Sequence, residues 1–182
     1  MNLEKGTFVC PDGRALTLRS PRAGDAATML DYLRQTSAET HFLVREADEF
    51  TMTDEEEGAF LTHYLSGERC FMLAAFDGDE VVANCDIAPL GSMKRVLHRA
   101  SFGIAIKQKF CGQGLGRELL RIALDEARRL GYLQVELGVY ADNPRARHLY
   151  EKLGFREMGV IPNAFHLSDG SFRDEVQMVC FL

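Results

Sequence analysis

The chain has 182 residues, of which 46% are hydrophobic and 26% are charged, and its formal net charge is −6. This negative charge argues against a protein that binds nucleic acid through phosphate contacts, because such proteins concentrate positive charge on their surface. No apolar run is long enough to span a membrane, and the first ten residues lack the apolar core of a secretory signal. The sequence therefore predicts a globular cytoplasmic protein without a nucleic-acid or membrane partner.

The cysteines and histidines argue against a disulfide framework and a metal site. Five cysteines are an odd number, and no two of them form a Cys-x-x-Cys pair. The five histidines show neither His-x-x-x-His nor His-Glu-x-x-His spacing. We therefore expect reduced thiols and no bound metal.

The first third of the chain predicts one strand followed by two helices. Residues Arg14–Ser20 alternate apolar and polar side chains, as a half-buried strand does. A helix follows Asp25, which we expect to act as its N-cap. A second helix is predicted for Thr53–Leu65, because Thr53 and Glu56 have the spacing of a capping box and Gly67 follows as a stop.

The middle of the chain predicts a hairpin and a buried strand. Two β-rich runs flank the turn sequence Asp77-Gly78-Asp79, which is a strong hairpin signal. The next run, residues 98–110, is apolar on both faces near its centre and is typical of the interior of a sheet. A glycine-rich bend and a helix that stops at Gly131 come next.

The last third predicts a strand, a short helix and a final hairpin. The strand covers Leu133–Val139, and the helix has Asn143 as its cap, Pro144 at its first position and Gly154 after its last. Two strands then flank Asp169-Gly170. The whole pattern is one α/β (α+β) domain over residues 1–182, with about seven strands in a mixed sheet and about four helices.

The bend "KFCGQGLGREL" places three glycines between a strand and the start of a helix. A helix start carries unpaired N–H groups and the positive end of the helix dipole, which suit phosphate oxygens. Arg117 adds a formal charge in the first helical turn. The bend is therefore either a phosphate cradle or only a turn.

Two other phosphate motifs fit this bend poorly. The P-loop pattern GxxxxGK[ST] is absent, and the dinucleotide fingerprint GxGxxG would need a third glycine where Arg117 stands. Glu136 has the separation of the acidic residue in that fingerprint, but it lies in the middle of a predicted strand.

Two segments, "IAIKQKFCGQGLGREL" and "VELGVYADNPRARHLYEKLGF", resemble the GCN5-related N-acetyltransferase (GNAT) superfamily. The first resembles the cofactor signature [QR]-x-x-G-x-[GA], with Gly114 and Gly116 at its glycine positions. The second matches N-x-x-A-x-x-x-Y-x-x-x-GF at Asn143, Ala146, Tyr150, Gly154 and Phe155. The order of elements around these motifs agrees with the superfamily over most of the chain.

The resemblance implies that acetyl-CoA binds in a cleft where two parallel strands, Phe102–Lys107 and Leu133–Val139, splay apart. It implies that backbone N–H groups of the bend bind the diphosphate and that the strand edge pairs with the pantetheine arm, one N–H also stabilising the thioester oxygen. The cofactor-binding residues so implied are Ile104, Ala105, Ile106, Gly112, Gln113, Gly114, Leu115, Gly116, Arg117 and Asn143. Tyr150 is implied as the acid that protonates the departing thiolate, the alternative being a tyrosine that only packs on the sheet.

Two positions depart from the superfamily pattern. Cys111 stands where Gln or Arg is usual, although contacts from this position are mainly made by the backbone. Gly138 stands where some members carry a catalytic Glu, so that base is missing here. The base therefore stays open between Asp86, Glu136, His98 and water, and we do not expect Cys111 to be a nucleophile.

The function implied is transfer of an acetyl group from acetyl-CoA to a primary amine of a small molecule or peptide, by direct attack in a ternary complex. The acidic stretches "READEF" and "TDEEEG" suit a cationic amine, or they only complement a helix dipole. The rival functions are a non-catalytic acyl-CoA-binding or sensing module and a nicotinamide-dependent oxidoreductase. The sequence leaves open the acceptor, the use of other acyl groups, and the choice between monomer and homodimer.

Overall fold

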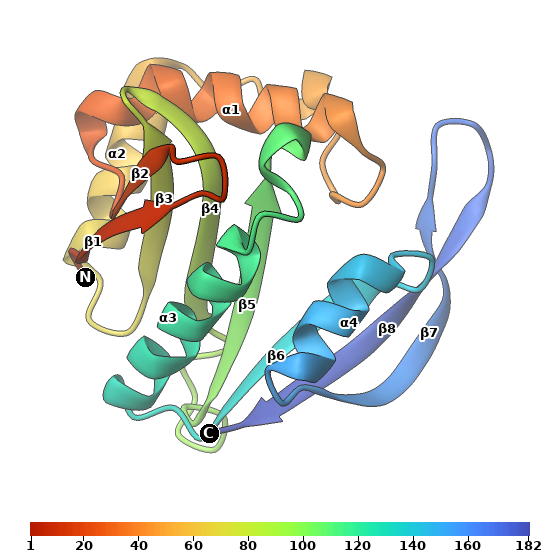
Figure 1. Cartoon of the computed structure of the whole chain (residues 1–182). Helices are drawn as coiled ribbons and strands as arrows, with labels where there is room; N and C mark the ends of the chain where they lie inside the picture. The colour runs from red at the N-terminus through yellow and green to blue at the C-terminus, as the bar shows by residue number, and fades with distance from the viewer.

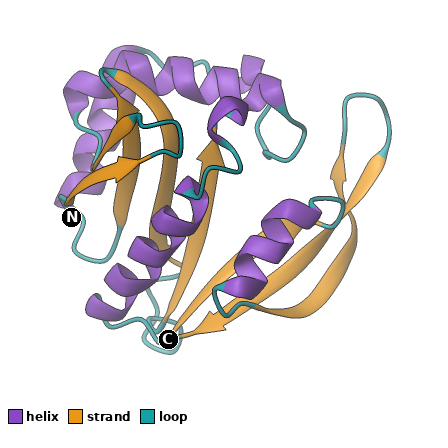
Figure 2. Cartoon of the chain, in the orientation of Figure 1, coloured by secondary structure: helices purple, strands orange, loops and turns teal.

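Eight strands form one mixed sheet in the order β1-β2-β3-β4-β5-β6-β8-β7 in the computed structural model, which describes all 182 residues (Figures 1 and 2). The strands are β1 (Glu4–Val9), β2 (Ala15–Arg19), β3 (Phe71–Asp77), β4 (Glu80–Pro89), β5 (Arg99–Ile106), β6 (Gln134–Tyr140), β7 (Arg156–His166) and β8 (Phe172–Phe181). The α-helices are α1 (Ala26–Glu39), α2 (Asp54–Ser66), α3 (Leu115–Arg129) and α4 (Pro144–Lys152). None of the helices has both the length and the apolar character that crossing a membrane requires.

The sheet has one strand more than the seven expected, and the additional strand is β1. This strand lies at the edge of the sheet, most of its side chains are exposed, and its register with β2 shifts between Glu4 and Gly6. Such a strand has no regular alternation of buried and exposed residues, which is the signal used to predict strands. The other predicted strands and the four helices are present in the predicted order.

The cap expected for α1 is also different. The Asp25 carboxylate accepts a hydrogen bond of 2.7 Å from the Arg22 N–H and pairs with the Arg19 guanidinium. It therefore caps a preceding 3₁₀ turn, Ala23–Asp25, and not α1 itself. The capping box of α2 and the Asn143 cap of α4 are confirmed.

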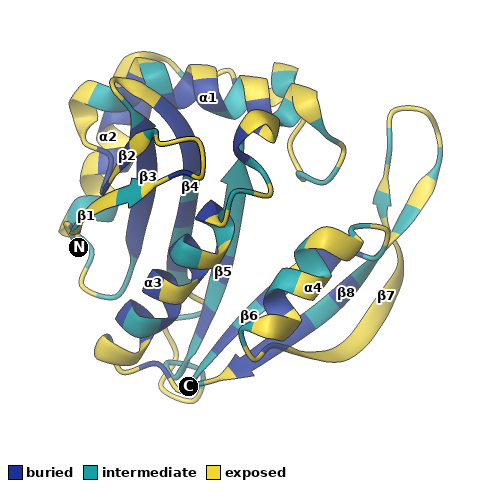
Figure 3. Cartoon of the chain, in the orientation of Figure 1, coloured by how far each residue is buried: buried dark blue, intermediate teal, exposed yellow.

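Two apolar clusters hold the helices to opposite faces of the sheet. The larger cluster packs α3 and α4 against one face, and the smaller packs α1 and α2 against the other. Figure 3 shows that β3 and β4 are buried between these layers, whereas β7 is exposed along most of its length. The centre of the sheet is thus covered on both faces, while on the β6-β8-β7 side α4 covers one face only.

The only parallel pair of neighbouring strands, β5 and β6, separates part of the way along the sheet. Their pairing runs from Arg99 opposite Gln134 to Ser101 opposite Glu136 and then stops. Each strand keeps its other neighbour, since β5 stays paired with β4 and β6 stays paired with β8. The sheet therefore opens as a V (Figure 1). With one parallel pair, it also lacks the parallel sheet of nicotinamide-dependent oxidoreductases of the doubly wound type.

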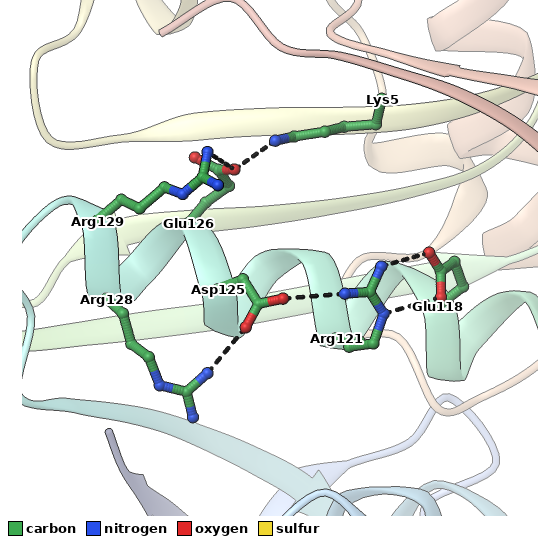
Figure 4. A network of polar contacts seen from close by, with 7 residues as sticks. All are labelled: Lys5, Glu118, Arg121, Asp125, Glu126, Arg128 and Arg129. Carbon is green, nitrogen blue, oxygen red and sulfur yellow. Dashed lines mark hydrogen bonds and ion pairs between the residues drawn. The ribbon is translucent and has the colours of Figure 1, made fainter.

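Ion pairs fix the outer face of α3 (Figure 4). The nearly buried carboxylate of Glu126 accepts from Lys5 of β1 and lies 3.4 Å from the Arg129 guanidinium. This contact ties α3 to the first strand. The exposed chain of pairs along the helix adds only about 0.3–0.5 kcal/mol for each pair; it joins Glu118, Arg121, Asp125 and Arg128.

The hydroxyl group of Tyr32 on α1 bridges β4 and β5 beside the V. It donates to the Ala105 carbonyl over 2.7 Å and accepts from the Asn84 N–H over 3.1 Å. Tyr32 is 1% exposed, so the side chain that bridges these two backbone groups is itself removed from bulk water. Tyr32 of α1 thus takes part in the hydrogen bonding of β5, which forms one wall of the V.

Replacing Tyr32 by phenylalanine should lower the free energy of unfolding by about 1–3 kcal/mol, because two partly buried backbone groups lose the hydroxyl that bridges them. Urea denaturation measures this change. Tyr140→Phe is the matched control, since the Tyr140 hydroxyl makes only a 3.4 Å contact with the Leu43 carbonyl. Equal stability of the two variants would contradict the bridging role.

Candidate active site

The V between β5 and β6 contains a cavity of about 790 Å³, which we call the splay cavity. Its walls come from β5 and β6, the bend before α3, one side of α4 and the segment after α1. Nine of the eleven predicted site residues line it: Ile104, Ala105, Ile106, Gly112, Gly114, Gly116, Arg117, Asn143 and Tyr150. The remaining two, Gln113 and Leu115, lie in the bend but do not line the cavity, and the Leu115 side chain is buried in the core.

The bend before α3 presents a run of unpaired backbone donors. None of the N–H groups from Gly112 to Arg117 donates to an acceptor in the protein, and the first helical bond of α3 runs from the Glu118 N–H to the Gly114 carbonyl. Gly112 and Gly114 have φ values of +81° and +89°, which side chains rarely tolerate. Six successive free donors at the positive end of a helix favour an anion with several oxygens.

The glycines also make room for close packing around the bend. A Cβ atom on Gly112 would lie 2.7 Å from a guanidinium nitrogen of Arg145, and one on Gly116 would lie 3.1 Å from Ile106. At Gly114 the nearest atom to such a Cβ is Phe8 Cζ of β1, 3.8 Å away, which is an ordinary contact distance. Gly114 itself lines the cavity, so a charged side chain there would place its charge beside the unpaired N–H groups of the bend.

The side of α4 that lines the cavity is positively charged. Arg145, His148 and Lys152 have i, i+3 and i+7 spacing, and all three line the cavity together with Arg117. Arg117, Arg145 and Lys152 form no ion pair with a carboxylate. Only Arg117 was predicted from the sequence; the helical spacing was the one local feature that the other three shared.

The free edge of β5 offers peptide groups to the cavity. The hydrogen bonds from Lys107 N–H to Val82 and from Leu90 N–H to Arg99 show that odd-numbered residues of β5 bond to β4. In an antiparallel ladder the even-numbered residues then point their peptide groups the other way. The peptide groups of Ile104 and Ile106 accordingly face the V. The carbonyl of Ala105 points the other way and accepts from the Tyr32 hydroxyl.

Tyr150 and Asn143 both line the cavity from α4. Tyr150 is 7% exposed, its hydroxyl has no hydrogen-bond partner in the protein, and burial raises its pKa to about 12. The phenol is thus a proton donor at neutral pH. The Asn143 Oδ1 atom accepts from the Ala146 N–H over 3.1 Å, which leaves its NH₂ group available to the cavity.

Three of the sequence-derived candidates for reactive groups are poorly suited. Glu136 forms two hydrogen bonds of 2.5 and 2.6 Å with Arg99, and this guanidinium lowers the pKa of the carboxyl. Neither Glu136 nor His98 lines the splay cavity. Burial raises the pKa of the Cys111 thiol, which disfavours the nucleophilic thiolate.

Of the two candidate carboxyls, Asp86 and Glu136, only Asp86 has surroundings that favour proton uptake near neutral pH. Burial raises its pKa to about 6, while a 3.3 Å hydrogen bond from the Tyr64 hydroxyl acts in the opposite direction. Its carboxylate lies against Gly103 of β5, where a Cβ atom would be 2.9 Å from Oδ1. Asp86 does not line the splay cavity itself.

A second cavity of about 840 Å³ adjoins the first, and we call it the hairpin cavity. It lies between the segment after α1 and the β7–β8 hairpin. Tyr140 and Phe165 line both cavities, and their rings stack at 3.8 Å. Glu46 and Asp48 of "READEF" line the hairpin cavity, whereas Asp54–Glu57 occupy the first turn of α2 and line neither cavity.

A sequence model of the acetyltransferase (GNAT) family matches residues 28–155 of the chain. The chain is 36% identical over 92 residues to the ribosomal protein bS18-alanine N-acetyltransferase of Escherichia coli, a match that covers 50% of this chain and 62% of that protein. It is 30% identical over 106 residues to the spermidine N(1)-acetyltransferase of Escherichia coli, covering 55% of this chain and 56% of that protein. The chain thus matches less than two thirds of the length of either relative.

Solved structures share the fold over nearly the whole chain. An acetyltransferase of the GNAT family from Streptococcus pneumoniae has a TM-score of 0.87 and 30% identity, covering 92% of this chain and 99% of that one. A phosphinothricin acetyltransferase from Sinorhizobium meliloti in complex with acetyl-CoA has a TM-score of 0.79 at 18% identity, covering 92% and 88%. The latter likeness shows the fold alone.

Asp86→Asn should stabilise the protein more at pH 7 than at pH 4. Folding raises the pKa of this carboxyl, so its favourable contribution is complete below the unfolded-state pKa of about 4 and is lost as the pH rises through about 6. The asparagine has no charge to bury. The unfolding free energy of Asp86→Asn relative to the wild type should therefore rise by at most about 3 kcal/mol from pH 4 to pH 7. Urea titrations at both pH values test this, and a difference that is independent of pH would contradict the buried charge.

Proposed function

The chain belongs to the acetyltransferase (GNAT) family, and from this premise we propose that it transfers an acetyl group from acetyl-CoA to a primary amine of a small molecule or peptide. The observation that carries the proposal is the run of six unpaired N–H groups from Gly112 to Arg117, in a bend of which Gly112, Gly114, Gly116 and Arg117 line a cavity between splayed strands. An extended cofactor with a diphosphate at one end and a thioester at the other suits such a site.

The positive charges around the bend support binding of the nucleotide end of acetyl-CoA. The six N–H groups bind the diphosphate oxygens, and Arg117 and Arg145 neutralise their charge. Lys152 extends the same positive surface along α4, with His148 between it and Arg145 on the cavity side. These residues attract and orient the cofactor without taking part in the chemical step.

The strand edge and Tyr150 support the chemistry at the other end. Bound acetyl-CoA supplies an acetyl group activated as a thioester. The peptide groups of Ile104 and Ile106 pair with the amide-rich pantetheine arm, and a backbone N–H of this edge stabilises the negative charge that develops on the thioester oxygen. Tyr150 donates its proton to the thiolate that leaves.

The hairpin cavity is the proposed site of the acceptor. It adjoins the splay cavity at Tyr140 and Phe165, so a molecule in it can extend an amine toward the thioester. The relatives named above are N-acetyltransferases of an alanine of ribosomal protein bS18 and of spermidine, so both act on nitrogen. This common chemistry supports an amine acceptor and leaves the molecule that carries it open.

An acceptor screen with purified protein tests the proposal. Acetyl-CoA is incubated with polyamines, amino acids and peptides, and the free thiol of CoA is measured. Turnover with at least one amine is expected. Acetyl-CoA binding without thiol release from any acceptor would instead favour the non-catalytic acyl-CoA-binding module.

Gly114→Glu should abolish high-affinity binding of acetyl-CoA, because its side chain would place a negative charge where the diphosphate binds. Gly131→Glu is the matched control: Gly131 also has a positive φ, but a Cβ there meets nothing within 4 Å and the residue lines neither cavity. Both variants carry the same backbone strain. Calorimetry should show a loss of affinity of at least about 100-fold for Gly114→Glu alone; retained affinity in a folded variant would contradict the cradle.

Tyr150→Phe should lower kcat by about 100-fold, which is a typical contribution of a general acid, and should leave the Kd for acetyl-CoA unchanged. Tyr132→Phe is the control, since Tyr132 is buried outside both cavities and donates to the Arg69 carbonyl. Steady-state kinetics and calorimetry measure the two effects. Full turnover in Tyr150→Phe would reject Tyr150 as the acid.

A further inference from the structure

The two strands that form the V each carry a glycine beneath a carboxylate from the neighbouring strand. Asp86 of β4 lies over Gly103 of β5, and Glu175 of β8 lies over Gly138 of β6. Because a glycine has no side chain, each carboxylate can lie over its neighbouring strand, but only that of Glu175 lines the splay cavity. Asp86 was considered from the sequence, whereas nothing in the sequence pattern pointed to Glu175.

The Glu175 carboxylate occupies the space that a side chain on Gly138 would need. A Cβ atom built on Gly138 would lie 2.6 Å from the Glu175 Cδ atom and would overlap one carboxylate oxygen. The other oxygen accepts a 2.6 Å hydrogen bond from the Gln177 Nε2 atom, which holds the carboxylate in this position. Glu175 forms no ion pair, so its charge is not neutralised by a protein cation.

Glu175 also lies where the two cavities meet. Both Glu175 and Gly138 line the splay cavity, which also contains the free edge of β5. In the β6–β8 register Glu175 is directly opposite Tyr140, which lines both cavities. The negative charge of Glu175 is close enough to act on the Tyr140 phenol, whose pKa is raised by burial, by Asp142 and by Glu175.

We propose that Glu175 is the catalytic base that accepts a proton from the acceptor amine. This inference rests on the proposed function, and it assigns the base that the sequence left open. Glu175 is favoured over Asp86 because its carboxylate lines the cavity shared with the strand edge, whereas that of Asp86 lies outside it. An unpaired carboxylate at this position also attracts an ammonium group from the hairpin cavity.

The reaction then balances with the groups present. The Glu175 carboxylate takes one proton from R–NH₃⁺, and the neutral amine nitrogen forms a bond to the carbonyl carbon of the thioester. The carbon–sulfur bond breaks, and the sulfur leaves with the bonding electron pair and receives a proton from Tyr150. The nitrogen loses a further proton, which restores the Tyr150 hydroxyl through solvent, and Glu175 releases its proton to water. The products are the acetamide, CoA as a free thiol and one proton.

The test uses Glu175→Gln in the full chain, with spermidine and a peptide that begins with alanine as amine probes. The glutamine keeps the size of the side chain and can still bond to Gln177. At pH 7, kcat/KM should fall by at least about 100-fold, while the Kd for acetyl-CoA and the melting temperature stay close to those of the wild type. Asp174→Asn is the matched control, because this neighbouring carboxylate is exposed and accepts from the Asn163 N–H.

The pH profile separates a base from a merely structural residue. Glu175→Gln can use only amine that is already neutral, so its kcat/KM should rise with pH and level off near the pKa of the probe amine, about 8 for the peptide α-amine and higher for spermidine. The deficit against the wild type should shrink over the same range. The other titratable groups near Glu175 are present in both proteins and cannot produce the difference: Tyr140 on β6 and the adjoining group of His41, Asp142 and Arg173.

A transplanted carboxylate supplies a second readout. Glu175→Gly empties the space above Gly138, and adding Gly138→Glu returns a carboxylate to it from the other strand. Recovery of at least tenfold in kcat/KM over Glu175→Gly supports the proposal.

If the wild type is active and Glu175→Gln stays within threefold of it at pH 7, Glu175 is not the base, and the proposed acetyl transfer is unaffected. If the wild type binds acetyl-CoA but acetylates neither probe, the proposed function fails and the base fails with it.

Discussion

The site depends on the end of pairing between β5 and β6 after Ser101 and Glu136. Both strands keep their outer neighbours, so the cost of the opening is confined to one seam in which peptide groups lose their partners. In an ordinary sheet those groups would be a defect. Here they line a cavity of about 790 Å³, next to a helix start whose own six N–H groups are also unpaired. Unpaired backbone donors are thus concentrated in one place, and a ligand rich in oxygen acceptors satisfies them.

Side chains around the opening have complementary charges at its two ends. Arg117 and Arg145 lie at the bend before α3, where phosphate charge is proposed to bind. Carboxylates from β4 and β8 lie over Gly103 and Gly138, and that of β8, Glu175, lines the splay cavity. The proposed binding of the anionic part of the cofactor and of the amine thus uses opposite charges within adjoining cavities. Glycine serves both ends, by freeing N–H groups in the bend and by letting neighbouring carboxylates reach across the splayed strands.

Much of the fold and part of the site could be predicted from the sequence. Strong local signals gave correct helices and strands: the capping box at Thr53 and Glu56, the Asp-Gly turn of the β3–β4 hairpin, and the glycine after α3. The two motifs led to the family, which the family match confirms. The edge strand β1 was missed because half-exposed residues have no alternating pattern.

The residues that the sequence did not reveal act through contacts between distant segments. Tyr32 bonds to Ala105, 73 residues away, and Glu175 lies over Gly138 only because of the register of β6 with β8. No local spacing encodes such contacts, and a shift of register by one residue would turn Glu175 to the other face. The positive side of α4 did have a helical spacing, but without the cavity it could not be distinguished from a solvated helix face.

Amide hydrogen exchange on the wild-type protein, with and without saturating acetyl-CoA, tests the central claim most directly. In the free protein the N–H groups of Gly112–Arg117 lack acceptors, and they should exchange rapidly. With the cofactor bound, these groups and the free edge at Ile104 and Ile106 should become protected together, while the N–H groups of β1 stay unchanged. Measurable binding that leaves the Gly112–Arg117 amides unprotected would contradict the account.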